Sequence, residues 1–153
     1  MQPTEPLQLH HSWPLFEREK RFELGQVIRP RAWFKSQSGD DSIHGAELAR
    51  RGIGLWACDL SDNSLTWSAA VYDIFGLQRG TAVRRDEAVG LYAEDSRAAM
   101  ERLRAYAIKH QRGFTLDAEI RPAQGPARWM RLIAAPVCEG DRVVRLTGLK
   151  LLI

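Results

Sequence analysis

Apolar and polar residues alternate with a period of two along several stretches of the chain, a pattern that predicts β-strands. The clearest case is the segment 114–121, where one face is apolar and the other polar. Two more strands are expected at 128–137 and 142–152. Alternation at 53–60 and 64–67, on either side of a short polar turn, predicts a hairpin. The sequence therefore predicts five strands joined mainly by tight turns, which favours antiparallel pairing.

Helical spacing of apolar residues marks other stretches of the chain, whereas residues 81–92 are ambiguous, with a helical turn expected from Asp86. The best helix is expected from residue 95 or 96 to about residue 110, with Gly113 as its stop. A short helix is expected over 69–75, with Ser68 at its N-cap. Another is expected over 43–51. Strands in succession with helices gathered on one side predict an α+β fold.

Residues 1–42 differ in composition from residues 43–153, and the polar run at 37–42 marks the boundary. The first segment holds four of the seven prolines, two of the twelve glycines and five of the thirteen aromatic residues. Its Ser12-Trp13-Pro14 sequence is compatible with the start of a short helix. A linker is one reading, but so many aromatic side chains favour docking on the domain or on a partner subunit. The expected interface residues are Trp13, Phe16, Phe22, Trp33, Phe34, Ile43 and Leu48.

Charge and hydropathy exclude several classes of function. The chain has 22 lysines and arginines against 19 aspartates and glutamates, and this net charge of +3 is spread rather than clustered, so nucleic-acid binding is not expected. No apolar run reaches the roughly 20 residues that cross a bilayer, and a secretory signal is not recognisable. Two cysteines, Cys58 and Cys138, allow one disulfide at most. A cytoplasmic protein without a membrane span or a metal site is expected.

Several short motifs follow one another in a specific order. Gly-x-Trp-x-x-Asp-Leu at 54–60 is followed by Leu-Thr-Trp-Ser at 65–68 and by Val-Tyr-Asp-Ile-Phe-Gly-Leu at 71–77. Arg-Trp-Met-Arg occupies 128–131. Their order and spacing over residues 43–153 resemble the PAS sensory domain family, in particular the subfamily that opens with the first motif. The resemblance implies a five-stranded antiparallel sheet with helices on one face, preceded here by the extension.

The resemblance also implies a cavity between the sheet and the helices. The residues expected to face a small ligand there are Trp56, Trp67, Tyr72, Phe75, Leu91, Leu103, Tyr106 and Leu132, although these side chains could instead simply fill the interior. Flavin and haem are cofactors of some relatives, and His110 on the long helix is the candidate haem ligand. Residues 77–94 contain no cysteine, which excludes the thiol-adduct flavin chemistry of one subclass. No cofactor is assigned by the sequence.

Catalytic constellations are not recognisable. The Gly-x-Gly-x-x-Ala pattern at 52–57 precedes a predicted strand instead of a helix, so it does not indicate dinucleotide binding. Asp59 with Tyr106 is the single pair considered for an enzyme on a related fold. The family commonly ends with Asp-Ile-Thr where residues 151–153 are Leu-Leu-Ile, so output through a C-terminal helix is not implied. The preferred hypothesis is a non-catalytic signalling module that forms a homodimer or docks on a partner protein. A small-molecule sensor is the alternative, and a small enzyme the third.

Overall fold

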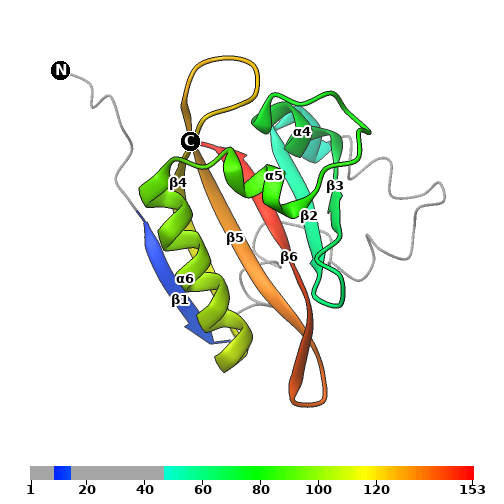
Figure 1. Cartoon of the computed structure of the whole chain (residues 1–153), viewed down its shortest axis with the longest axis vertical. Coiled ribbons are helices and arrows are strands. Elements are labelled where there is room, and N and C mark those ends of the chain that lie inside the picture. The colour runs from blue at the N-terminus through cyan, green and yellow to red at the C-terminus, as the bar shows by residue number, and fades with distance from the viewer. Residues whose placement is uncertain (1–8, 15–46) are drawn as a thin grey trace.

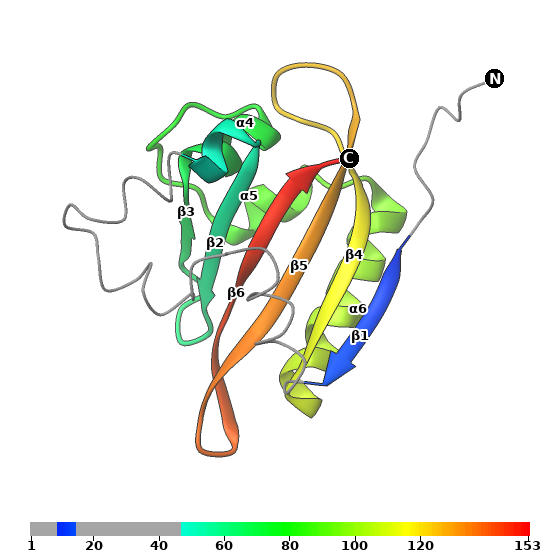
Figure 2. The same cartoon turned by 180° about the vertical axis from the view of Figure 1, so that it is seen from behind.

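The computed structural model describes residues 9–14 and 47–153. In this part of the chain an antiparallel sheet has six strands in the spatial order β1-β4-β5-β6-β2-β3. Figures 1 and 2 show α4 (Ala69–Phe75), α5 (Arg85–Gly90) and α6 (Glu94–His110) on the same side of that sheet. The predicted α+β architecture with helices on one face is therefore confirmed. In chain order the elements are β1 (His10–Pro14), β2 (Ile53–Asp59), β3 (Leu65–Trp67), α4 (Ala69–Phe75), α5 (Arg85–Gly90), α6 (Glu94–His110), β4 (Arg112–Ile120), β5 (Arg128–Glu139) and β6 (Arg142–Leu152).

Ser68 connects the predicted hairpin of β2 and β3 to the first helix of the inner face. It stands at the N-cap of α4, as the sequence predicts, but its side chain makes no capping bond. Its Oγ instead accepts a hydrogen bond of 2.9 Å from the backbone N–H of Leu55 in β2. Gly76 ends α4 with a φ of 67°, a left-handed conformation that glycine adopts at little cost. The C-terminal end of this helix is thus set by a local glycine, whereas the side chain of its N-cap residue is bonded to β2.

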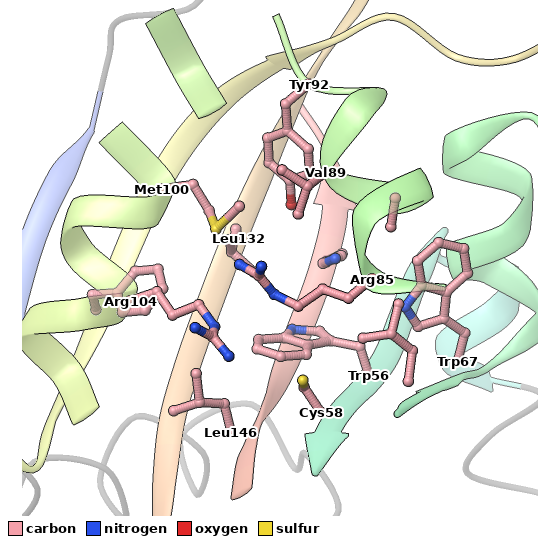
Figure 3. A pocket seen from close by; sticks show the side chains of 14 residues that line it. Trp56, Cys58, Trp67, Arg85, Val89, Tyr92, Met100, Arg104, Leu132 and Leu146 are labelled. Atoms are coloured by element: carbon pink, nitrogen blue, oxygen red, sulfur yellow. The ribbon is translucent and has the colours of Figure 1, made fainter. Parts of the chain in front are cut away.

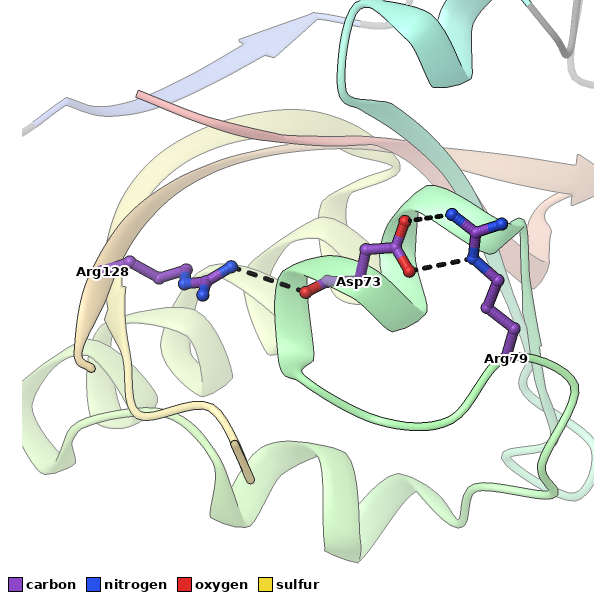
Figure 4. A network of polar contacts seen from close by, with 3 residues as sticks. All are labelled: Asp73, Arg79 and Arg128. Carbon is purple, nitrogen blue, oxygen red and sulfur yellow. Dashed lines mark hydrogen bonds and ion pairs between the residues drawn. The ribbon is translucent and has the colours of Figure 1, made fainter. Parts of the chain in front are cut away.

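A small polar network fixes the loop after α4 (Figure 4). The Arg79 guanidinium donates to both carboxylate oxygens of Asp73, with Nε–Oδ1 at 3.0 Å and Nη2–Oδ2 at 2.7 Å. These hydrogen bonds hold the pKa of Asp73 below its ordinary value. Arg128, at the start of β5, reaches the backbone oxygen of Asp73 at 3.5 Å. The Asp73–Arg79 pair is exposed and so adds little stability. The contact from Arg128 joins the C-terminal turn of α4 to β5.

Residues 10–14 form a strand, so the expected helix start at Ser12-Trp13-Pro14 is wrong. β1 pairs antiparallel with β4, and Trp13 lies opposite Gly113. The Trp13 indole packs so closely there that a Cβ on Gly113 would stand 2.3 Å from it. Its Nε1 also donates to Thr115 Oγ1 at 3.3 Å. These contacts join residues about a hundred positions apart, and they outweigh a weak local preference for helix. As a result the sheet gains a sixth strand from the extension, outside the 43–153 range.

Two of the seven expected interface residues, Trp13 and Leu48, lie in the described part of the chain. Trp13 is completely buried against its own sheet. Leu48 lies in a helical segment at 47–50 and packs, partly buried, against a cluster on the outer face of the sheet. Phe16, Phe22, Trp33, Phe34 and Ile43 lie outside the described residues. The domain boundary at residue 42 likewise falls outside them.

The boundaries of α6 differ from the predicted ones by small but informative amounts. Ala93 is the N-cap and Glu94 the first helical residue, one position earlier than expected. Gln111 ends the helix with a φ of 54°, so the stop is not Gly113, which lies within β4. Glycine is needed at 113 for a different reason, because the Trp13 indole covers it. The helix therefore ends without the glycine that the sequence suggested.

Asp117 lies on the polar face of the strand predicted at 114–121, yet its side chain is fully buried. Arg131, on the neighbouring strand β5, donates to its two carboxylate oxygens at 2.8 and 3.1 Å. The backbone N–H of Asp117 donates to the backbone oxygen of Leu9 at 2.7 Å, because Leu9, the residue before β1, also lies beside β4. The hydrogen bonds that the Arg131 guanidinium donates to Asp117 raise the pKa of that arginine. A buried carboxylate is tolerated here because it is paired.

Two hydrophobic clusters lie on opposite faces of the sheet. The larger one sits between the sheet and the helices and includes Val71, Phe75, Leu116, Ile120 and Met130. The smaller one, on the outer face, consists of Trp13, Leu55, Ala135 and Leu149 with partly buried neighbours. Cys58 and Cys138 are not joined by a disulfide, and they lie on β2 and β5, which β6 separates. Across residues 9–14 and 47–153, none of the helices combines the length and apolarity needed to span a bilayer.

Candidate functional site

A cavity of about 50 Å³ lies on the inner side of the sheet, beneath α5 and α6 (Figure 3). Five strands and two helices supply its walls, so it lies where the separate layers of the fold meet. Most of its surface is apolar, contributed by aromatic and aliphatic side chains together with two sulfur atoms. The lining residues are Trp56, Cys58, Leu65, Trp67, Arg85, Ala88, Val89, Tyr92, Met100, Arg104, Phe114, Leu132, Leu146 and Lys150.

Three of the eight expected ligand-facing residues, Trp56, Trp67 and Leu132, line this cavity. Phe75 is buried one layer deeper, stacked on Trp67 with ring centroids 5.0 Å apart. Tyr72 meets the edge of Trp67 at 5.2 Å, and its hydroxyl donates to the backbone oxygen of Thr81 at 2.8 Å. These two aromatic residues support the wall of the cavity without facing its interior.

The remaining expected residues lie away from the cavity. Leu91 and Leu103 are partly buried against the inner core. Tyr106 is 46% exposed and packs on His110, with ring centroids 4.3 Å apart. The helix α6 turns Ala99, Met100 and Ala107 inward. Tyr106 lies outside this inner stripe of α6. His110 does not reach the cavity, so nothing supports it as a haem ligand.

Lys150 in β6 is the residue that sequence reasoning missed. It is only 6% exposed, and its Nζ lies among four aromatic rings. The distances from Nζ to the ring centroids are 5.1 Å for Trp56, 5.5 Å for Trp67, 4.8 Å for Phe75 and 6.0 Å for Tyr92. Positions 146, 148 and 150 share one face of β6, since side chains alternate along a strand. A lysine that shares one strand face with buried positions was therefore a signal available in the sequence.

The environment of Lys150 disfavours its charge. Desolvation by burial lowers the pKa of Lys150 from 10.5 to about 7, while Cys58 opposes this change and Arg85 adds to it. Within the described part of the chain, its Nζ makes no hydrogen bond and no ion pair. The aromatic faces favour the ammonium form, but a cation–π contact does not replace a hydrogen-bond acceptor. Lys150 is thus a buried amine that titrates near neutrality.

Two arginines reach the same cavity. Arg85 extends from the start of α5 and forms an ion pair with Glu101 of α6. Arg104 extends from α6, and its Nη2 also donates to Asn63 Oδ1 at 3.1 Å. Figure 3 shows the two guanidinium groups entering the pocket from opposite sides and pointing toward each other. The described lining therefore carries three basic side chains and no aspartate or glutamate.

Trp67 contributes an unpaired donor to the same wall. Its Nε1 is buried and lacks a hydrogen-bond partner. By contrast, Nε1 of the neighbouring Trp56 donates to the backbone oxygen of Ile133 at 3.3 Å. Buried indole N–H groups normally find an acceptor, so an orphaned one points to a missing partner. The described cavity presents donors from Lys150, Trp67 and the arginines, with few acceptors among its lining groups.

Cys58 lines the cavity from β2, and burial raises the pKa of its thiol above 9.0. Burial likewise raises the pKa of Tyr92, so its hydroxyl stays neutral. These groups do not supply a negative charge to balance the three basic ones at neutral pH. The interior is positive and largely apolar.

The cavity does not fit the large cofactors of this fold. Sites for ligands of cofactor size enclose about 300–1,000 Å³, several times the volume found here. Trp56, Trp67 and Phe75 pack with Lys150 in the space beside the cavity, and moving them would disrupt the stacked core. We therefore derive no flavin or haem chemistry for this site.

Comparison with solved structures finds the same fold in sensor proteins. A sensory box histidine kinase/response regulator from Burkholderia thailandensis matches with a TM-score of 0.60 and 14% identity, covering 71% of this chain and 82% of that chain. The N-terminal domain of a diguanylate cyclase with a PAS/PAC sensor, from Marinobacter aquaeolei, matches with a TM-score of 0.59 and 11% identity, covering 65% and 93%.

A third match shows that the resemblance can be confined to one part of a larger protein. An RNA-binding light-oxygen-voltage receptor matches with a TM-score of 0.58 and 15% identity, covering 65% of this chain but only 29% of that chain. No protein-family model matches the chain, and no curated protein does so either. The sheet order, the helices on one face and these structural matches together show that the chain has the fold of PAS sensor domains.

Proposed function

We propose that this chain is a non-catalytic signalling module of the PAS type, belonging to the subfamily that opens with Gly-x-Trp-x-x-Asp-Leu. A small molecule in the cavity beneath α5 and α6 is its input, and contact with a second copy of the chain or with a partner protein is its output. One observation carries the proposal: the cavity is lined jointly by two helices and the sheet. The similar structures from a sensor kinase and a diguanylate cyclase support a role in signal transduction.

Because of the position of the cavity, a bound ligand would affect the sheet as well as the helices. A molecule held there would contact α5, α6 and β6 together, so its binding would favour one arrangement of these elements over another. Lys150 lies in β6 only two residues before Leu152, which is 44% exposed, and Ile153 is 43% exposed. A change in β6 would therefore extend from the cavity to exposed apolar side chains, which suit a protein contact.

The geometry gives the enzyme alternative no support. Asp59 is the last residue of β2, where its Oδ1 accepts hydrogen bonds of 2.9 and 2.7 Å from the backbone N–H and the hydroxyl of Ser61. Tyr106 is exposed on α6. Neither residue lines the cavity, so the one pair considered for catalysis is not brought together around a substrate.

The presence of a bound ligand and the association of the protein are to be measured on the same protein preparation. Native mass spectrometry of freshly purified full-length chain is expected to show a small bound molecule. Sedimentation velocity with and without that molecule is expected to show a change in association, with itself or with an added partner. A ligand-free protein whose melting temperature ignores a library of small metabolites, and whose association never changes, would contradict the proposal.

A further inference from the structure

We propose that the ligand of this cavity is a short-chain carboxylate, bound through its carboxylate by Lys150 and Trp67 with its apolar end against the aliphatic wall. The inference rests on the proposed function, because it names the chemical class of molecule that the same cavity takes. Three independent features of the lining lead to it: an unpaired buried amine, an orphaned indole N–H and an excess of cations.

The buried amine is the first feature. A charged group removed from water is costly unless it is paired and hydrogen-bonded. Lys150 is surrounded by ring faces, and within residues 9–14 and 47–153 no carboxylate or carbonyl oxygen accepts from its Nζ. Of the groups that small metabolites carry, a carboxylate satisfies both needs, because it brings the opposite charge and several acceptor positions.

The orphaned indole is the second feature, and it is independent of charge. Trp67 is 9% exposed, and its Nε1 finds no acceptor among residues 9–14 and 47–153. Lys150 Nζ lies 5.5 Å from the centroid of the same indole, and both residues line the cavity. A carboxylate has two oxygens and can accept from two donors at once. A ligand with one acceptor would leave one of these donors unsatisfied.

The surrounding charges are the third feature. Arg85 and Arg104 enter from α5 and α6, and Glu101, which pairs with Arg85, is not part of the lining. A low-dielectric cavity lined by one sign of charge concentrates ions of the other sign. The described lining therefore favours an anion and disfavours an amine or another cation.

The volume and the walls set the size of the ligand. A single water needs about 10–15 Å³ of such space, so the cavity of about 50 Å³ holds roughly three to five non-hydrogen atoms. Acetate has four such atoms and propionate five. Leu132, Leu146 and Met100 provide apolar contact for a methyl or ethyl group, which an inorganic oxoanion lacks.

Binding by Lys150 would couple the ligand to proton uptake. The groups that face Lys150 are Cys58 from β2, Arg85 from α5, Tyr92 after α5 and Arg104 from α6. Desolvation leaves Lys150 about half protonated near pH 7 in the free protein. Because a bound carboxylate favours the ammonium form, its affinity should fall about tenfold for each pH unit above 7 until the complex itself titrates.

Calorimetric titration of the full-length chain with acetate and propionate, at constant chloride from pH 6.5 to 8.5, tests the proposal. Propionamide has the same shape without the charge and is the matched ligand control. The variant Lys150→Met should bind propionate at least tenfold more weakly, whereas Lys109→Met, which removes an exposed lysine of α6, should bind it as the parent does. Trp67→Phe should weaken binding several-fold, and circular dichroism should show each variant folded.

The outcomes separate this inference from the proposed function. Carboxylate binding that weakens with pH and is lost in Lys150→Met supports both. Binding of propionamide or another neutral molecule in place of propionate overturns the carboxylate inference and leaves the sensing function intact. Propionate binding that Lys150→Met does not change also overturns the inference. If no small molecule binds at all, both fail.

Discussion

Lys150 is expected to make the stability of the ligand-free protein depend on pH in an unusual direction. In the unfolded chain this lysine holds its proton up to about pH 10.5. In the folded chain its pKa is lowered to about 7 by burial. Between these values the unfolded state binds more protons than the folded one, so the free energy of unfolding should rise with pH. Below pH 7 both states are protonated, and this contribution is flat.

The size of the effect follows from the two pKa values. Each unit of pKa corresponds to about 1.4 kcal/mol, so the slope well inside the window is about 1.4 kcal/mol per pH unit. Because Lys150 is still half protonated at pH 7, the rise between pH 7 and pH 9 should be about 2 kcal/mol. For a chain of 153 residues this corresponds to an increase of roughly 5 °C in melting temperature.

The replacement Lys150→Met isolates this contribution. Methionine fills a similar volume among the aromatic rings and removes the buried amine. The variant should therefore be more stable than the parent at pH 7, and its advantage should shrink by about 2 kcal/mol between pH 7 and pH 9. Cys58 titrates in both proteins, so its contribution should largely cancel in the difference.

Urea unfolding at several pH values, in buffers without carboxylates, measures the difference, and Lys109→Met serves as the control for loss of an exposed lysine. A difference between Lys150→Met and the parent that stays constant with pH would refute the reasoning. So would a variant several kcal/mol less stable at every pH, since that would mean that Lys150 is well paired in solution.

Three further predictions concern two close contacts in the sheet and one buried thiol. In Gly148→Ala the new Cβ would lie 1.8 Å from a backbone oxygen of β5, so urea unfolding should show a free energy of unfolding lower by about 3 kcal/mol or more. Gly90→Ala is the control, because nothing lies within 4 Å of its added Cβ. An equal loss of stability in the control would contradict the explanation. In Gly113→Ala the Cβ would stand 2.3 Å from the Trp13 indole, so hydrogen exchange should show β1 released from the sheet, and unchanged protection would count against this contact. Cys58 is 3% exposed with a raised thiol pKa, so it should react with a thiol reagent at pH 8 at least tenfold more slowly than a model peptide thiol, and rapid labelling would exclude the described burial.

Much of the candidate site was predictable from the motifs, but not its chemistry. Trp56 and Trp67 could be assigned to the cavity because they face each other across the predicted hairpin of β2 and β3. Tyr106 could not be excluded by its spacing, since a small rotation of α6 decides whether that ring is buried or exposed. Lys150 was overlooked because a lysine in a strand normally suggests solvent, although its alternation with positions 146 and 148 placed it on the buried face of β6.

Local pattern by itself determined most of the elements of this protein. Strand alternation, turn residues and the glycine after α4 act within a few positions, so the hairpins and the short helix follow from the sequence. The tertiary structure decided the rest, because it depends on residues far apart in the chain. β1 is a strand because β4 offers it an edge and a glycine beneath Trp13. Lys150 titrates near neutrality because rings from β2, β3, α4 and the segment after α5 exclude water from it. Burial and edge pairing are properties of the assembled sheet, and no short window of sequence contains them.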